Sequence, residues 1–149
     1  MRILVCSGTS FLLAVLWFDL MFDTQVLGKS GATLPEETLD SISRYYSRVT
    51  TTAKPMNRLV GVAMLGTLVA LAVEVLKHQI PSSRAVMSLV LVVLAISIAL
   101  GRTLRNAVRL GRQEEDLVTQ SRLARLVLRD HLILFVALGL VLMLQLLPV

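Results

Sequence analysis

Four long stretches without a charged side chain constrain the fold of this chain more than any other feature. They cover residues 3–18, 59–73, 85–101 and 132–149 of a chain of 149 residues and contain no Asp, Glu, Lys, Arg or His. A soluble domain of this size has no interior large enough to bury four such segments. The pattern therefore predicts an all-α integral membrane protein, a bundle of four transmembrane helices.

The composition agrees with a membrane protein and argues against a nucleic-acid-binding one. Hydrophobic residues make up 55% of the chain and charged residues 17%, against about 25% charged in an ordinary soluble domain. In a soluble protein the net charge of +5 would suggest nucleic acid as a partner. Here the basic residues lie at the predicted helix ends, where the positive-inside rule accounts for them. We predict no nucleic-acid partner.

No residue pattern predicts a metal or a cofactor. Cys6 is the only cysteine, which excludes an internal disulfide and a cysteine-based metal cluster. The acidic residues and His131 near the predicted membrane surface lack the Glu-x-x-His or His-x-x-His spacing of helical metal sites. We therefore predict no metal, no cofactor and no catalytic residue.

The uncharged stretches are each shorter than the roughly 20 residues that cross about 30 Å of hydrocarbon. Each helix must therefore carry charged residues at its ends or into the bundle, where long side chains can reach water. We predict a single domain over residues 1–149, with spans at about 3–23, 57–77, 84–104 and 128–148.

The first apolar stretch begins like a signal peptide, because Arg2 precedes it. The small-x-small cleavage pattern of signal peptides does not follow, and bulky Trp17, Phe18 and Met21 stand in its place. We expect this segment to be retained as the first transmembrane helix.

Lys and Arg residues are distributed unevenly between the two sides of the membrane. The connections between spans one and two and between spans three and four hold twelve of them, whereas Arg2, Lys77 and Arg84 are the only ones elsewhere. By the positive-inside rule the long connections are cytoplasmic and both termini lie outside. We predict a bacterial inner membrane protein with both termini periplasmic.

The first long connection is predicted to contain an amphipathic helix at about 34–50. Thr33-Leu34-Pro35-Glu36 fits a capping box with proline in the first turn. We expect the helix to lie along the headgroup layer as an interfacial helix, and docking of a partner protein is the alternative. Its apolar and aromatic residues at helical spacing are Leu39, Ile42, Tyr45, Tyr46 and Val49.

The second long connection is predicted to be a helical hairpin that protrudes from the membrane. Arg102, Arg105 and Arg109 continue the third span as an extension, and Gly111 is expected to end it. The charged turn at 113–116 can cap the fourth helix, which begins well before the membrane.

Two acidic residues at the end of the first span require partners. Asp19 and Asp23 are four residues apart and share a helix face, and a carboxylate inside a span costs roughly 2.5–3.5 kcal/mol. Asp19 should therefore point into the bundle, toward basic residues at the same depth. The predicted ion-pair network, which would fix the register of the helices, comprises Asp19, Asp23, Arg102, Arg105, Arg129, Asp130 and His131.

Arginines follow one face of each helix of the predicted hairpin. Such rows can hold phosphate or carboxylate groups through forked hydrogen bonds. An anionic phospholipid headgroup is the nearest ligand of this kind. Membrane topology alone is the simpler explanation of the charges, and a soluble anion is a further alternative. The predicted anion-binding residues are Arg102, Arg105, Arg109, Arg122 and Arg125.

Small residues on the second span predict close packing of helices. Ala63, Gly66 and Ala70 lie on one side of it, where another helix of the same chain or of a second copy can approach. Glu74 lies on the same side, and we expect it to form a local ion pair with Lys77.

The chain resembles uncharacterised small four-span bacterial membrane proteins at three segments: WFDLMFD at 17–23, RNAVRLG at 105–111, and residues 120–131. The resemblance covers most of the length and implies no activity. Size and span number are also similar to the membrane-associated eicosanoid and glutathione metabolism family. The Arg/Asn/Glu signature of that family lies on a different helix, so no functional residue is carried over.

The sequence thus predicts a non-catalytic membrane protein. It would be an accessory or structural subunit of a larger membrane complex, or a homo-oligomer, with lipids bound along its helix faces. The expected partners are the lipid bilayer, anionic phospholipids, and other membrane protein subunits or further copies of the chain. The alternative is a membrane enzyme or carrier with an anionic-ligand site on the cytoplasmic side, where arginines bind and Asp19, Asp23 or His131 accepts a proton or acts as a ligand.

Overall fold

The computed structural model describes residues 1–77 and 82–147. This part of the chain is helical and contains no strand. The predicted all-α fold with four helices able to span a membrane is confirmed. Each of these helices begins before the predicted span, and the first and third also end after it. The fourth ends at Leu146, so residue 147 of the predicted span follows the helix, and residue 148 lies outside the described residues. The four helices are Arg2–Val26, Lys54–Lys77, Ser83–Arg112 and Leu117–Leu146.

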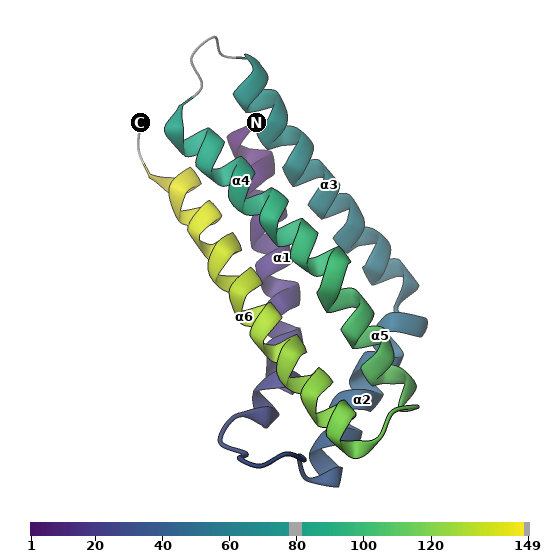
Figure 1. The fold of residues 1–149 in the computed structure, drawn as a ribbon. Coiled ribbons are helices and arrows are strands. Elements are labelled where there is room, and N and C mark those ends of the chain that lie inside the picture. Colours follow the sequence, from purple (N-terminus) through teal and green to yellow (C-terminus); the bar gives the residue numbers. More distant parts are fainter. Residues whose placement is uncertain (78–81, 148–149) are drawn as a thin grey trace.

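Figure 1 labels the elements in chain order. The first and third spanning helices are continuous but change their winding, to a 3-10 turn at the end of the first and to a π-helical turn within the third. The elements are α1 (Arg2–Asp23), η1 (Thr24–Val26), α2 (Glu36–Thr51), α3 (Lys54–Lys77), α4 (Ser83–Ile98), η2 (Ala99–Thr103), α5 (Leu104–Arg112) and α6 (Leu117–Leu146).

The bundle has two distinct ends (Figure 1). α1 packs against both α3 and α6, and α4 packs against the same two helices. The two termini lie at one end, with the last turn of α3 and the first turn of α4; we call it the termini end. α2, α5 and the first turns of α6 lie at the opposite end, which we call the loop end.

Buried apolar side chains form two clusters, one between the spanning helices and one at the loop end. The cluster between the spanning helices includes Leu71 and Val141. The cluster at the loop end includes Ile42 and Leu110 and joins α2 to α5 and α6. Phe135 packs against both clusters. The loop end therefore has a hydrophobic core of its own.

The amphipathic helix predicted at 34–50 is present as α2, but its apolar face is covered by protein. Leu39, Ile42 and Tyr46 are at most 5% exposed, because α2 packs against α5 and α6. This face therefore does not insert between lipids as an interfacial helix would require. Its location in the headgroup layer stays a prediction.

The start of α2 differs from the predicted capping box. The helix begins at Glu36 after Pro35, and no side chain caps it. The Pro35 carbonyl accepts hydrogen bonds from the amides of Thr38 and Leu39 at 3.0 and 3.1 Å. The Leu34 amide instead donates to Ser121 Oγ on α6 at 2.8 Å, so the residues before α2 are fixed by tertiary contact.

The hairpin between α5 and α6 has the predicted acidic cap but not the predicted glycine stop. Asp116 caps α6 by accepting from the amides of Val118 and Thr119. α5 continues past Gly111 and ends at Arg112, and Gln113 takes the left-handed conformation at φ 57°. Gly111 serves packing instead, since a Cβ there would lie 2.7 Å from the Ser47 amide nitrogen. The backbones of α2 and α5 are in contact at this point.

The small residues of α3 do not all face the same neighbour. Ala70 is buried, Ala63 is half-buried, and Gly66 is exposed, with nothing within 4 Å of the position of a Cβ. α3 comes very close to α1 at Thr67, because a Cβ on Gly8 would collide with the Thr67 hydroxyl. The glycine that allows close packing is thus on α1.

Candidate functional site

The loop end contains a buried ion pair between the third and fourth spanning helices. Arg102 donates through Nε to Asp130 Oδ2 at 2.7 Å and through Nη2 to Asp130 Oδ1 at 2.5 Å. The Asp130 side chain is fully buried, while 44% of the Arg102 side chain is exposed. The Thr103 hydroxyl lies 3.4 Å from Asp130 Oδ2, and Arg129 Nε lies 3.7 Å from Oδ1. The carboxylate is therefore surrounded by donors.

The π-helical turn η2 positions this ion pair. Arg102 and Thr103 are both within it, and the Thr103 hydroxyl donates to the Ile98 carbonyl five residues earlier. A π turn holds one residue more than an α turn and is frequent at functional sites. The apolar pattern of the third stretch predicts a continuous helix and gives no sign of this turn, although Gly101 and Thr103 within it are weak helix formers.

A second buried group lies one residue along α6 and joins three helices. His131 Nδ1 on α6 lies 2.6 Å from Asp23 Oδ2 at the end of α1. The Tyr46 hydroxyl on α2 donates to Asp23 Oδ1 at 2.7 Å and lies 3.4 Å from His131 Nδ1. All three residues are at most 6% exposed. This group fixes α2 to the spanning helices.

Asp19 is held by the neighbouring tyrosine. The Tyr45 hydroxyl donates to Asp19 Oδ1 at 2.6 Å, and the Tyr45 ring stacks on Phe22 with ring centres 4.0 Å apart. Burial raises the pKa of Tyr46 well above its ordinary value, and burial followed by the charge of Asp19 does the same for the pKa of Tyr45. Both phenols therefore stay protonated and act as donors.

The predicted ion-pair network is thus divided into two buried groups that meet at Asp130 and His131. The hydrogen bond to Asp19 comes from Tyr45, which is not among its predicted basic partners Arg102, Arg105, Arg129 and His131. Arg105 is exposed and makes no hydrogen bond or ion pair with any described residue. Sequence reasoning assigned the tyrosines to a lipid-facing surface and so missed them as partners of both aspartates.

The arginine rows are largely occupied by contacts within the chain. Arg102 binds Asp130, and Arg109 binds Glu115 with Nε 3.0 Å from Oε1. Arg125 donates to the Gly31 carbonyl at 2.8 Å, with the carbonyls of Lys29 and Ala32 each 3.4 Å away, and so clamps the first loop. Of the five predicted anion-binding arginines, Arg105 and Arg122 remain exposed without a described partner.

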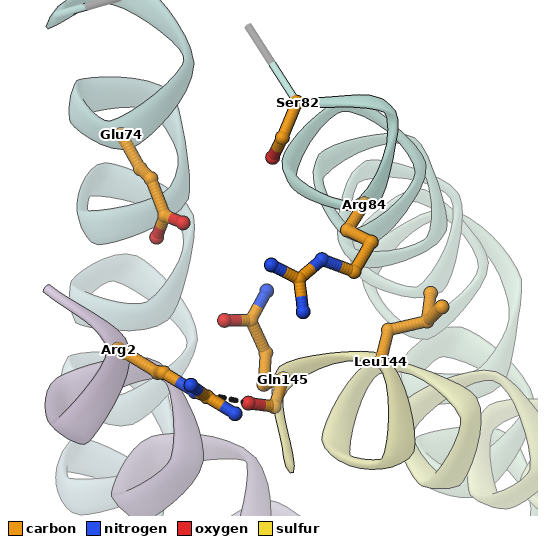
Figure 2. Close-up of a pocket in the computed structure, with 6 residues that line it drawn as sticks. All are labelled: Arg2, Glu74, Ser82, Arg84, Leu144 and Gln145. Atoms are coloured by element: carbon orange, nitrogen blue, oxygen red, sulfur yellow. Dashed lines mark hydrogen bonds between the residues drawn. The ribbon is translucent and has the colours of Figure 1, made fainter. Parts of the chain in front are cut away.

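The termini end contains a small polar cavity of about 90 Å³ (Figure 2). Its lining includes Glu74, Gln145 and two arginines from the first turns of α1 and α4. Arg2 donates to the carbonyls of Gln145 and Leu147, and Arg84 donates to the Leu147 carbonyl at 2.9 Å. The two guanidinium groups thereby satisfy the free carbonyls at the end of α6.

Glu74 points into this cavity without the predicted ion pair to Lys77. Its Oε2 is buried and has no hydrogen-bond partner among the described residues. The side-chain amide of Gln145 donates to Ser88 Oγ on α4 at 3.1 Å. The described residues contain no group of three acidic, His or Cys side chains placed to hold a metal ion.

Comparison with known proteins identifies the family of this chain. The family model for the SHR3 chaperone, described as ER membrane protein SH3, matches residues 1–147. No curated protein and no solved structure matches the chain. The chain belongs to the SHR3 chaperone family.

Membership of the SHR3 family corrects the predicted location. The chain is an integral membrane protein of a eukaryotic ER family, so the predicted bacterial origin and bacterial inner membrane are wrong. The predicted periplasmic position of the termini has no support. The family is described as an ER membrane chaperone family, and a non-catalytic accessory role in a membrane agrees with that description.

Proposed function

We propose that this protein assists the folding or packaging of multi-span membrane proteins in the ER, without catalysis and without remaining in the finished complex. The family match over residues 1–147 is the observation that carries the proposal. Under this proposal the protein is a chaperone whose partners change, and not the permanent subunit or homo-oligomer predicted from the sequence.

The surface of the bundle suits such a role. In the most apolar stretch of 18 residues of each helix, 17% of α3 is buried inside the protein, against 39% of α6. Leu59, Val62 and Leu65 of α3 are each more than half exposed. Because so little of α3 is buried against the other helices of the chain, a large apolar surface remains for the helices of another membrane protein.

The loop end supports the proposal by keeping the chaperone folded on its own. The buried pairs of Asp130 with Arg102 and of Asp23 with His131 tie the first, third and fourth spanning helices together. α3 takes no part in either pair. The fixed helices therefore form a frame to which α3 and a client can be added.

Lipid binding at the loop end is a finer part of the proposal. Arg105 and Arg122 are exposed guanidinium groups close to the predicted membrane surface. We propose that they contact anionic phospholipid headgroups, which would hold the loop end at the membrane surface.

The experiment is purification of the tagged protein from ER membranes of its own cell in a mild detergent, after a pulse of labelled amino acids and a chase. We expect several multi-span membrane proteins to be recovered after the pulse and lost during the chase. Loss of the gene should leave the same proteins in the ER. Recovery of one partner at a fixed ratio throughout the chase would contradict the chaperone role and indicate a permanent subunit.

A further inference from the structure

Two hydroxyl groups inside the bundle have no hydrogen-bond partner. Thr9 on α1 and Thr67 on α3 are at most 1% exposed, and neither Oγ1 has a partner in the described chain. Helical hydroxyls elsewhere in this protein donate to the carbonyl four residues earlier, as at Thr50, Ser97 and Ser121. Thr9 and Thr67 do not use this bond, so their hydrogen-bonding capacity is unused.

Both residues belong to helices that pack closely against each other. Gly8 of α1 lies against Thr67, with 3.5 Å between the position of a Gly8 Cβ and Thr67 Cβ, and against the Ala63 carbonyl. Ala70 is buried one turn further along α3. We call the contact of Gly8 with Ala63 and Thr67, together with the neighbouring buried residues Thr9 and Ala70, the α1–α3 seam.

The unused polar capacity of α3 continues toward the termini end. Glu74 is seven residues, or about two helical turns, after Thr67. Figure 2 shows its side chain directed from α3 into the space beside α1 and α4, and its buried Oε2 lacks a described partner. The inner face of α3 thus carries two polar side chains that its own bundle leaves incompletely bonded.

An unbonded polar group in a low-dielectric interior costs free energy, roughly 1–3 kcal/mol for a hydroxyl. Lipid tails cannot supply the missing partner, and within a bilayer it must come from another protein group. An unassembled membrane protein has the same requirement, because a polar side chain on one of its spanning helices lacks a partner until its other helices pack against it. The unbonded hydroxyls of this protein and the unbonded polar side chain of such a client could therefore bond each other.

We propose that the α1–α3 seam is the binding site for a client transmembrane helix that carries a hydrogen-bonding side chain near its middle. This inference rests on the proposed function and names the client surface within it. α3 moves away from α1, and the client helix enters between them, against Thr9 on one side and Thr67 on the other. The small residues of the seam allow the client backbone to come close, and the two hydroxyls, each able to donate and accept, bond its Ser, Thr, Asn or Gln side chain.

The mobility required of α3 agrees with its contacts. α3 packs against α1 and α4 within the membrane and makes fewer buried contacts than α6 over its apolar part. Neither buried ion pair of the loop end includes it. Its displacement therefore leaves the packing of α1 against α6 intact.

A reversible lock of the seam tests the proposal. The Cβ separation of 3.5 Å at positions 8 and 67 is within the range of roughly 3.5–4.5 Å found in disulfides. The variant Gly8→Cys, Thr67→Cys is made together with Cys6→Ser, so that the two new cysteines are the only ones. The protein is placed in nanodiscs with a labelled probe, a polyleucine transmembrane helix with one Asn at its centre. Oxidised protein should lose binding of this probe, and reduction should restore it.

Hydroxyl-free variants separate binding from folding. Thr9→Val and Thr67→Val keep the shape of each side chain and remove the unbonded oxygen. We expect unchanged or higher thermal stability and roughly a 3- to 10-fold weaker binding of the Asn probe, with unchanged binding of an all-leucine probe. The single variants Gly8→Cys and Thr67→Cys, each with Cys6→Ser, control for the substitutions in the lock.

Each outcome decides for or against the proposal. If the oxidised lock binds the Asn probe as well as the reduced protein does, or if the valine variants keep full preference for Asn, the seam is not the client site. Lower stability of the valine variants would mean that the hydroxyls are bonded within the bundle, which also overturns it. The recovery of multi-span proteins in the pulse experiment is independent of these results, so the proposed function can stand when the seam fails.

Discussion

Asp19 and Asp23 illustrate how acidic residues at a membrane rim can be bonded without lysine or arginine. Two tyrosine hydroxyls and one imidazole hold their carboxylates, and a neutral phenol adds a donor without adding a second charge to desolvate. The guanidinium of Arg102 is used instead at Asp130, where the carboxylate is fully buried. Which group bonds each aspartate is therefore determined by the position of α2, which brings in the two tyrosines, as much as by charge.

The first residue-scale prediction concerns Arg102. Replacing it by Gln leaves the buried Asp130 without its main counter-charge, and we expect a loss of about 1–3 kcal/mol in the free energy of unfolding, less than for a fully buried pair because 44% of the Arg102 side chain is exposed. The control is Arg44→Gln, since Arg44 pairs with Asp40 at an exposed site and its loss should cost at most about 1 kcal/mol. Thermal unfolding in micelles, followed with a thiol-reactive dye on Cys6, measures both. Equal losses would contradict a structural role of the buried pair.

The second residue-scale prediction concerns Gly111. A Cβ there would lie 2.7 Å from the Ser47 nitrogen and 2.9 Å from the Tyr46 carbonyl carbon, so Gly111→Ala should force α2 and α5 apart and cost about 1–3 kcal/mol. Gly66→Ala is the matched control, because a Cβ there meets nothing within 4 Å. The same unfolding assay should find the control neutral or slightly more stable. A neutral Gly111→Ala would mean that the contact is not tight in solution.

At the scale of single elements, the helices that cross the membrane could be predicted and the way they meet could not. Length and the absence of charge are enough to predict a span. A cap from the charged turn at 113–116 could also be predicted, because capping is local in sequence, and Asp116 of that turn provides it. The contact of Arg125 with the Gly31 carbonyl joins residues 94 positions apart, and no periodicity encodes such a contact. α2 was assigned to the lipid surface for the same reason, because its amphipathic pattern does not reveal what covers it.

The acidic cap of α6 gives a prediction about pH. Hydrogen bonds from the Thr119 hydroxyl and amide hold the pKa of Asp116 below its ordinary value of 3.8. The capping contribution is therefore fully present above pH 3.8 and is lost as the pH falls through the lower pKa of the folded state. A spin label at position 117, in a Cys6→Ser background, should become mobile only in that acidic range. In an Asp116→Ala variant the label should be mobile at every pH, and a mobility independent of Asp116 would contradict the cap.

At the scale of the whole molecule, the two hydrophobic clusters divide the protein into a spanning part and a loop end. Each cluster has its own buried residues, and the side chain of Phe135 packs against both. Such a division allows one part to open while the other stays folded. α2 can therefore loosen while the pairs of Asp130 with Arg102 and of Asp23 with His131 keep the spanning helices together.

The matching prediction uses Ile42, which is fully buried on α2. Ile42→Ala should remove about 2–5 kcal/mol of packing and release α2, so that trypsin cuts after Arg44 and Arg48 while the spanning helices remain protected. Leu59→Ala, on the exposed face of α3, should leave the cleavage pattern unchanged. Mass spectrometry of the digest in nanodiscs distinguishes the two. Cleavage throughout the spanning helices of the Ile42→Ala variant would show that the protein unfolds as one unit.

The π-helical turn at Ala99–Thr103 determines how far α5 is rotated about the helix axis relative to α4. Each residue advances an α-helix by about 100°. Deleting the exposed Leu100 would restore ordinary winding and turn the following helix α5 by that angle, carrying Leu110 and Gly111 away from α2. A single residue of chain length thus decides whether this helix can contact α6 and α2 at the same time.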